Sequence, residues 1–449
     1  MSMREGNLEA PTRHPVDWRD PAYYDEAACN AELARLFDIC HGCRRCVSLC
    51  NAFPTLFDLV DDGPTGEVEG IATADFARVV DQCYLCDLCY MSKCPYVPPH
   101  QWNVDFPHTM LRAKAIRFKK GEVRFRDKLL SATDALGKLA TIPVVVQAVN
   151  AVNRSPAARA LMESGLGVKK ERWLPAYDSA RFRPGAAPSR PHPVRDGERT
   201  PGKAAIFATC YVNFNEPGIG HDLLAILDHN EIPHTLADKE ACCGMPKLEL
   251  GDLDAVARNK ARNIPQLAAL ARQGYAILTP IPSCTLMYKT ELPLLFPDDA
   301  DVKAVAAAMF DPFEYLVLRG KDGLLKTDFR HSLGRVSYHV ACHLRVQNIG
   351  RKTEEMLKLA GAEVNTVERC SGHDGTWGVK REYYETSMKI GKPVFKAMAG
   401  NAPDWISSDC AIAGRHILQG MTEAGVAGDA RKAHPLTLLR KAYGIPDYP

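Results

Sequence analysis

The sequence lacks a strong charge of either sign, a long apolar run and a leader-like segment. Its 56 basic and 54 acidic residues give a formal net charge of +2, which does not favour a nucleic-acid partner. The longest apolar candidate, residues 139–152, is broken by Pro143 and Asn150 and is shorter than a membrane-spanning helix. Residues 1–30 are polar and do not resemble a signal peptide. We expect a cytoplasmic protein, or one lying peripherally on the inner face of the cytoplasmic membrane.

Nucleotide-binding fingerprints are also scarce. Gly218-Ile219-Gly220 precedes a helical stretch, but it has no third glycine and no placed acidic ribose ligand. A turn into a helix explains this tripeptide better than a dinucleotide loop does. Because no flavin or nicotinamide fingerprint is present, we do not expect the chain to oxidise an organic substrate by itself.

Cysteine, in contrast, is abundant, with sixteen in 449 residues. Eight of them form two runs at three-residue spacing, the second with one extra residue before its last Cys, which Pro95 follows. The first run is Cys40, Cys43, Cys46 and Cys50, and the second is Cys83, Cys86, Cys89 and Cys94. Three thiolates at this spacing can ligate three irons of a cuboidal cluster, and in two-cluster ferredoxins the fourth Cys comes from the other run.

The spacing therefore predicts two crossed 4Fe–4S clusters. The first would be held by Cys40, Cys43, Cys46 and Cys94, and the second by Cys83, Cys86, Cys89 and Cys50. The alternative is zinc, which uses paired C-x2-C hairpins and has no use for a third thiolate at this spacing. Thiols that ligate iron also need a reducing compartment, which agrees with the cytoplasm.

Helical sequence surrounds the two runs, with short helices expected over residues 32–39 and 73–80. Farther on, residues 112–128 contain eight basic residues against two acidic ones, with apolar residues between them. This basic stretch fits an amphipathic segment that docks on anionic lipid or an acidic partner, and it fits a solvated helix face equally well. Residues 181–202 hold five Pro and five Arg and read as a linker.

An internal repeat follows the linker. In each copy an apolar strand ends at a Cys, a helix and a second strand lead to a Cys motif, and a third strand ends near another Cys. The corresponding cysteines lie 132, 128 and 126 residues apart, so the two copies share one plan. The first copy has Cys210, Cys242, Cys243 and Cys284, and the second has Cys342, Cys370 and Cys410. Alternating strands and helices predict parallel α/β modules, with each Cys beyond the carboxyl end of a strand.

The expected fold is α+β overall, with a helical two-cluster ferredoxin domain before a duplicated small α/β module. The predicted parts are a tail (1–30), the ferredoxin domain (31–115), an amphipathic helical segment (116–180), the linker (181–202), the first module (203–330) and the second, degenerate module (331–449).

As a joint pattern, these motifs resemble a known family. Two ferredoxin runs followed by two cysteine-rich "CCG" modules are similar to a subunit of glycerol-3-phosphate dehydrogenase, to the iron–sulfur subunits of glycolate and lactate oxidases, and to heterodisulfide reductase. Besides the ferredoxin cysteines, the resemblance rests on Cys210, Cys242-Cys243-Gly244, Cys284, Cys342-His343, Cys370-Ser371-Gly372, Gly375-Thr376-Trp377-Gly378, Cys410 and His434-Pro435-Leu436.

Departures from the family pattern limit what the resemblance implies. A complete family module has five cysteines, but Met287 stands at the last position of the first module, which leaves four thiolates for an ordinary third cluster. In the second module Ser371 and Ala413 replace two cysteines. A fourth cluster there would have to recruit Ser371, His343 or His373 or keep one iron open; the alternative is an empty structural copy. Cys29 fits no spacing and is expected to be an ordinary buried or tail thiol.

The resemblance implies an iron–sulfur electron-transfer subunit without a catalytic site of its own. It would take electrons from a flavoprotein dehydrogenase or another redox protein and pass them to quinone, at peripheral membrane contact, or to another acceptor. One alternative is a thiol–disulfide reductase of the heterodisulfide type, which the missing cysteines disfavour. A second alternative, from a different class, is an interaction scaffold stabilised by metal.

Overall fold

The computed structural model describes residues 10–187, 189–238 and 240–448. Its internal contacts divide the chain into two compact units. Unit 1 comprises Met1–Ser131, Pro246–Val256 and Leu294–Pro297, and unit 2 comprises Ala132–Met245, Ala257–Pro293 and Asp298–Pro449. The domain boundaries expected from the sequence stay predictions.

Unit 1 is built from short helices around an aromatic core. Its elements are η1 (Pro21–Tyr24), α1 (Glu26–Cys43), α2 (Ala52–Asp61), η2 (Val68–Gly70), η3 (Thr73–Asp75), α3 (Phe76–Val80), α4 (Leu88–Ser92), α5 (Phe106–Lys119) and α6 (Phe125–Leu130). Phe37 of α1 meets Phe76 edge to face at 5.1 Å between ring centroids, and Phe53 lies 4.8 Å from Phe106. Helix α1 begins six residues before the helix expected at residue 32, because Asp25 caps it by accepting from the Ala28 N–H.

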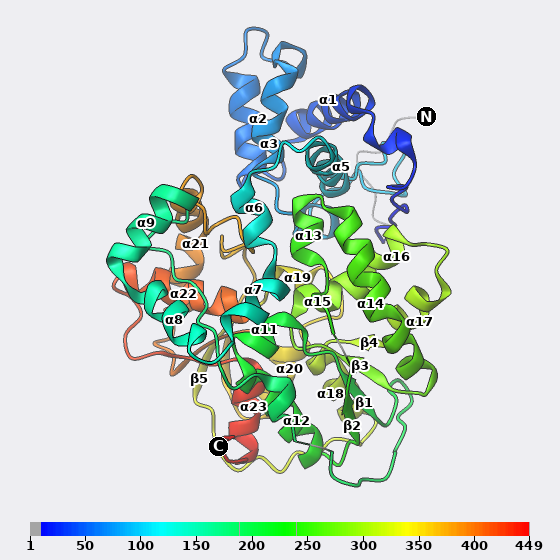
Figure 1. Cartoon of the computed structure of the whole chain (residues 1–449), viewed down its shortest axis with the longest axis vertical. Helices are drawn as coiled ribbons and strands as arrows, with labels where there is room; N and C mark the ends of the chain where they lie inside the picture. Colours follow the sequence, from blue (N-terminus) through cyan, green and yellow to red (C-terminus); the bar gives the residue numbers. More distant parts are fainter. Residues whose placement is uncertain (1–9, 188, 239, 449) are drawn as a thin grey trace. The chain divides into compact units, whose positions relative to one another are not determined.

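The first half of unit 2 holds a four-stranded parallel sheet in the order β2-β1-β3-β4 (Figure 1). Its strands are β1 (Ala204–Ile206), β2 (His234–Leu236), β3 (Ala276–Leu278) and β4 (Met309–Phe310). The helices in the same stretch of sequence are α11 (Thr209–Phe214), α12 (Pro217–His229), α13 (Met245–Leu250), α14 (Leu253–Arg272), α15 (Pro282–Leu286), the π-helix η4 (Met287–Glu291), α16 (Leu292–Leu295), α17 (Ala300–Ala308) and α18 (Pro312–Lys321).

The second half repeats the sheet with the order β6-β5-β7-β8, again all parallel. Its strands are β5 (Arg335–His339), β6 (Glu363–Val367), β7 (Trp405–Ser408) and β8 (Arg431–Lys432), and its helices are α19 (Cys342–Arg345), α20 (Lys352–Leu359), α21 (Tyr384–Met398), α22 (Ala411–Glu423) and α23 (Pro435–Tyr443). Shifting each strand number by four converts one order into the other. The predicted mixture of helices and parallel sheets is therefore confirmed. The sequence missed β4 and β8, which have two residues each and carry no readable pattern.

The two halves of unit 2 share one large hydrophobic core. Leu223 of α12 and Leu439 of α23 are both fully buried in the same cluster, which also contains residues of both sheets. A buried ion pair lies beside them, with Asp222 Oδ1 2.5 Å from Arg440 Nε. The second half adds a smaller cluster that includes Phe395. Burial of apolar surface from both copies in one core stabilises the two copies together.

Four further helices of unit 2 precede the first sheet: α7 (Thr133–Ala140), α8 (Val145–Arg154), α9 (Pro156–Leu166) and α10 (Phe182–Gly185). Phe182, at the start of the stretch expected to be a linker, is fully buried in the core of unit 2. In the described parts of the chain no single helix is long and apolar enough to span a membrane. Helices α7 and α8 meet the length and composition test only as a pair, and that pair is bent by 111°.

Candidate functional site

The thiols of the first ferredoxin run and Cys94 lie together in unit 1. Cys40 and Cys43 are in the last turn of α1, which ends at Arg44 in the left-handed region, and Cys46 lies in the turn that follows. Burial raises the pKa of the Cys40 thiol well above its ordinary value, and the neighbouring thiols of Cys94, Cys46 and Cys43 raise it further. Cys94 therefore lies with the thiols of the first run, while the crossed ligation of a cluster stays a prediction.

These four thiols line a common hollow. It encloses about 310 Å³ of empty space, part of which is open to solvent. Apolar side chains, including Phe53 and Val104, also line it, as do the basic residues Arg45 and Lys93. Four convergent thiols, an apolar surround and nearby cations fit an anionic iron–sulfur cluster. The residues present are thus compatible with the predicted group.

The second run gathers Cys50 in the same manner. Burial raises the pKa of the Cys89 thiol well above its ordinary value, and the thiols of Cys86, Cys83, Cys50 and Cys46 add to the shift in that order. Two residues of this loop, Leu85 and Asp87, have positive φ values of 55° and 60°. Such backbone lets the short loop turn its cysteines toward one side, at a steric cost that surrounding contacts must offset.

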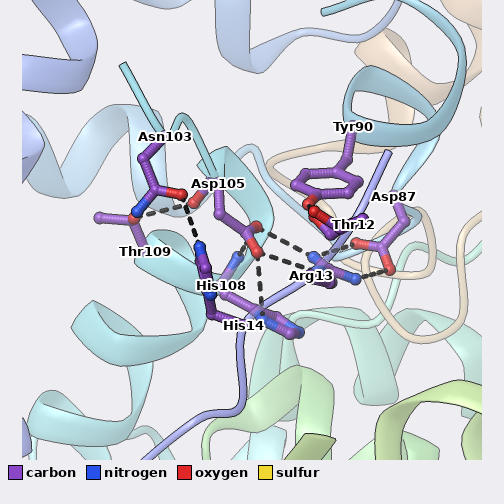
Figure 2. Close-up of polar contacts among 9 residues, drawn as sticks. All are labelled: Thr12, Arg13, His14, Asp87, Tyr90, Asn103, Asp105, His108 and Thr109. Atoms are coloured by element: carbon purple, nitrogen blue, oxygen red, sulfur yellow. Dashed lines mark hydrogen bonds and ion pairs between the residues drawn. The ribbon is translucent and has the colours of Figure 1, made fainter. Parts of the chain in front are cut away.

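A buried arginine supplies part of that support (Figure 2). Arg13 Nη1 lies 2.6 Å from Asp87 Oδ2, and Arg13 Nε lies 2.8 Å from Asp105 Oδ2. The guanidinium also lies 4.5 Å from the centroid of the Tyr90 ring. Burial alone would raise the pKa of Asp105, but the charges and hydrogen bonds of His108 and Arg13 lower it to about 2. Arg13 thus ties the loop of the second run to the N-cap of α5.

The basic stretch makes many of its contacts inside unit 1. Arg112 donates to the Tyr23 carbonyl at 2.7 Å, Lys114 to the Cys83 carbonyl, and Arg117 pairs with Asp81 at 2.8 Å. These side chains hold the segment around the second run. Docking of the stretch on lipid stays a prediction.

Single-ion geometry is not found. All sixteen cysteines lie in described residues, and none forms a disulfide. Within the described ranges, no three His, Cys, Asp or Glu side chains converge closely enough to hold one metal ion. In a cuboidal cluster each of four thiolates binds a different iron, so the ligand sulfurs lie farther apart than the four ligands of one zinc ion. Cys29 is buried in α1, away from the runs in sequence, as expected for an ordinary thiol.

In the first CCG module the four cysteines follow three adjacent strands and meet beyond their carboxyl ends. The thiols of Cys210 and Cys242, Cys242 and Cys243, and Cys243 and Cys284 lie close enough to shift one another's pKa. The neighbouring thiols of Cys210 and Cys243 lower the pKa of Cys242 well below its ordinary value. The Thr133 hydroxyl adds to this group, 3.4 Å from Cys242 Sγ and 3.5 Å from Cys210 Sγ.

Two buried polar side chains brace these loops. Asn263 is fully buried; it accepts from the Ala241 N–H at 2.8 Å and donates to the Cys242 carbonyl and to the Tyr288 hydroxyl. Glu240 accepts from the Thr209 N–H at 2.7 Å, which ties the loop after β2 to the loop after β1. Burial raises the pKa of Glu240 to about 7, although Arg183 and the backbone N–H groups oppose that shift.

A larger hollow opens beside the first module. It has about 630 Å³ of empty space, part of which is open to solvent, and Cys210 lies in its wall. Charged side chains of both signs line it: Asp134, Lys138, Arg181, Arg183 and Glu240. It is therefore a polar recess with direct access to one candidate ligand.

The second CCG module places its three cysteines in equivalent positions. Cys342 begins α19 after β5, Cys370 follows β6, and Cys410 is the N-cap residue of α22 after β7. Because β6, β5 and β7 are neighbours in a parallel sheet, all three lie beyond the same sheet edge. His343 Nδ1 lies 2.7 Å from Ser283 Oγ, the residue before Cys284 of the first module. His343 is thus a link between the two modules.

Several supporting residues had no signal in the sequence. Arg13 contacts Asp87 across 74 positions and Asn263 contacts Ala241 across 22, so no local motif connects them. Asp105 could have been found, since an Asp two residues before Pro107 is a typical helix start.

Comparisons with known proteins agree with this geometry. A model of the CCG cysteine-rich domain matches residues 204–289 and 336–414. A subunit of the anaerobic glycerol-3-phosphate dehydrogenase of Escherichia coli (strain K12) is 27% identical over 339 residues, which are 74% of this chain and 80% of that protein.

Two more relatives cover shorter stretches. A subunit of the fumarate reductase (CoM/CoB) of Methanothermobacter marburgensis is 27% identical over 253 residues, 55% of this chain and 48% of that protein. Lactate utilization protein A 1 of Bacillus cereus (strain 03BB102) is 27% identical over 218 residues, 46% of this chain and 87% of that protein. All three resemble this chain at a similar level of identity.

Proposed function

Since the chain carries two CCG cysteine-rich domains and is homologous to subunits of a dehydrogenase and of a reductase and to a lactate utilization protein, we propose that it is an iron–sulfur electron-transfer subunit. It takes electrons from a partner flavoprotein dehydrogenase and passes them to quinone or another acceptor. Unit 1 would be a helical ferredoxin domain with two 4Fe–4S clusters, and the first CCG module would hold a third cluster.

The observation that best supports the proposal is the hollow of unit 1 that Cys94 lines together with Cys40, Cys43 and Cys46 of the first run. Cys50 of the first run likewise acts on the buried thiol of Cys89, as does Cys46. Crossed ligation would use this proximity to hold two clusters, between which an electron could pass. The clusters supply one-electron redox chemistry when bound; the chain positions them and excludes water from part of their surface.

Unit 2 supports a terminal position for the electron in the CCG modules. The polar recess beside Cys210 gives an acceptor a place to approach the first module. The bond from His343 to Ser283 connects the cysteine loops of the two modules. Fewer thiolates in the second module imply less negative charge there, and a site of that kind has a higher reduction potential.

Two other functions are weaker. A heterodisulfide-type reductase would need the fifth cysteine of the first module, but Met287 fills that position and is fully buried. A zinc scaffold would need a single-ion ligand set, and none is found among the described residues. We therefore favour electron transfer over thiol–disulfide chemistry and over metal-stabilised binding.

The crossed arrangement is tested by Cys94→Ser and Cys50→Ser in the full chain reconstituted with iron and sulfide without oxygen. We expect Cys94→Ser to perturb the electron paramagnetic resonance signal that Cys40→Ser also perturbs, and Cys50→Ser to perturb the signal of the Cys89→Ser variant. Pairing in the opposite sense would refute the crossed assignment. Iron quantification below about eight atoms per chain in the unaltered protein would remove the two-cluster proposal. The partner is identified by co-purification of the tagged chain from its own host.

A further inference from the structure

A buried guanidinium from upstream of both repeats contacts the second CCG module. Arg172, which follows α9, is 2% exposed. Its Nη2 is 2.6 Å from His373 Nδ1, and its Nη1 bonds His416 Nδ1. Its Nε has no hydrogen-bond partner among the described residues.

No carboxylate of the described residues forms an ion pair with Arg172. The charges that act on Arg172 are those of Tyr384 and then Glu423, both of which raise its pKa. Glu423 itself bonds the Tyr384 hydroxyl at 3.1 Å and the Gln419 amide at 2.7 Å. Burial lowers the pKa of Arg172 to about 10, so the guanidinium still carries its charge at neutral pH. A buried charge without an opposite charge beside it destabilises the fold, and an anion in the site would offset that cost.

The guanidinium also fixes the protonation of two histidines. Since a guanidinium only donates, Nδ1 of His373 and Nδ1 of His416 both accept, and each neutral ring carries its proton on Nε2. His416 uses that proton to donate to the Ser371 carbonyl at 2.8 Å. In the same tautomer His373 offers an N–H group rather than a lone pair. This favours a hydrogen-bond donor over the iron ligand expected from the sequence.

The loop that carries Cys370 is held in place by the same surroundings. The Gly372 N–H donates to Cys370 Sγ at 3.3 Å, and Ser387 Oγ donates to the Gly372 carbonyl at 2.6 Å. Gly372 has a φ of +77°, and a Cβ there would lie 2.2 Å from the Ser387 carbonyl oxygen. The loop is therefore organised around a sulfur that accepts hydrogen bonds, as a thiolate does. An empty structural copy would not explain both a hydrogen bond to the Cys370 sulfur and a buried cation nearby.

We propose that Arg172 is the buried counter-charge of an anionic iron–sulfur group held by Cys342, Cys370 and Cys410. The inference rests on the proposed function, because it presumes that the chain carries iron–sulfur clusters. It adds that the second module is occupied and that Arg172 sets the potential of its group. Arg172 is a positioning residue: it acts through its charge and through the hydrogen bond to His373.

The test uses the full chain, reconstituted without oxygen, and follows iron content and redox titrations by electron paramagnetic resonance. Removing a positive charge disfavours the more negative, reduced state. For one signal, we expect Arg172→Gln to lower the ratio of reduced to oxidised group about tenfold at a fixed potential. For a one-electron couple this is a reduction potential lower by about 59 mV. Arg172→Lys keeps the charge and should restore most of that difference. The affected signal should be the one that Cys370→Ala abolishes.

Arg159→Gln is the matched control. Arg159 is also buried and donates to the carbonyls of Lys169 and Arg172, so it holds the same segment without contacting the histidines. We expect this variant to leave every potential unchanged. The proposal would also be supported if Arg172→Gln loses the same iron as Cys370→Ala while the other signals stay intact.

Two results would overturn it. If Cys370→Ala retains all the iron and all the signals of the unaltered protein, the second module holds no such group; the signals of unit 1 would still carry the proposed function. If Arg172→Gln lowers the unfolding temperature but changes neither iron content nor any potential, Arg172 is only a structural residue.

Discussion

The first CCG module brings four thiols into mutual contact, whereas the second combines three cysteines with a buried guanidinium. Both modules use the same order of parallel strands, and each places its cysteines beyond the carboxyl ends of the strands of its own sheet. The difference lies in the charge that each site presents. With iron–sulfur groups bound as proposed, four thiolates would make the first site strongly negative, while Arg172 and only three thiolates would make the second less so. The same fold would then hold two iron–sulfur groups at different reduction potentials.

Of the changes considered, removing one thiol of the first module should alter the difference between the two modules most, through its iron content. The thiols of Cys242 and Cys284 both raise the pKa of Cys243, which places Cys243 near both, so Cys243→Ala should remove about four iron atoms per chain from the first module. The control is Cys29→Ala, which removes a buried thiol outside every cysteine group. Iron quantification and visible absorbance measure the result. Equal iron in both variants would mean that the first module is empty.

The bracing of the two modules should also differ in strength. Asn263 is fully buried with four hydrogen bonds, so Asn263→Ala leaves buried groups unsatisfied and should cost about 2–3 kcal/mol of unfolding free energy. Asn365→Ala in the second module removes bonds from a partly exposed side chain and should cost about 1 kcal/mol. Denaturant titration of both variants compares them. A smaller loss for Asn263→Ala would contradict the brace.

Adding the missing thiol should make the modules more alike. Ser371 is buried next to Cys370, at a position where the complete family pattern has Cys. We expect Ser371→Cys to slow the loss of iron from the second module to a chelator several-fold, because a thiolate binds iron more strongly than a hydroxyl. Ser371→Ala is the control without a new ligand. Unchanged release in both variants would exclude this position from the site.

The smallest effect is expected at Thr133. Its hydroxyl lies 3.4 Å from Cys242 Sγ, and a hydrogen bond to a ligating sulfur raises the reduction potential of a cluster. Thr133→Val should therefore shift the potential of the first module to more negative values by less than about 59 mV, under tenfold in the redox ratio. Redox titration measures it, with the signals of unit 1 as internal controls. A positive shift would contradict this role.

The cysteine groups were predictable from the sequence because their information is local. Three-residue spacing indicates a cluster loop, and a repeat of the same strand–Cys order indicates a repeated sheet. The supporting contacts were not predictable in this way. Arg172 meets His373 across 201 positions, and nothing in its own neighbourhood marks it as more than a surface charge.

Short or buried elements inside irregular sequence were missed for a related reason. Strands β4 and β8 are too brief for alternation to be visible. Phe182 stands in a proline- and arginine-rich stretch, where composition suggests solvent, yet the core of unit 2 takes up its ring. Composition averages over a window, so it conceals a single anchoring side chain.

The position of Arg172 in the chain bears on how this duplication can be taken apart. The residue precedes both repeats in sequence, yet it serves the second of them. A fragment cut at residue 331 would keep every cysteine of the second copy and lose its cation. The second copy therefore depends on the upstream helical segment as well as on its own residues. Recombining it with a foreign partner would require carrying that segment along with it.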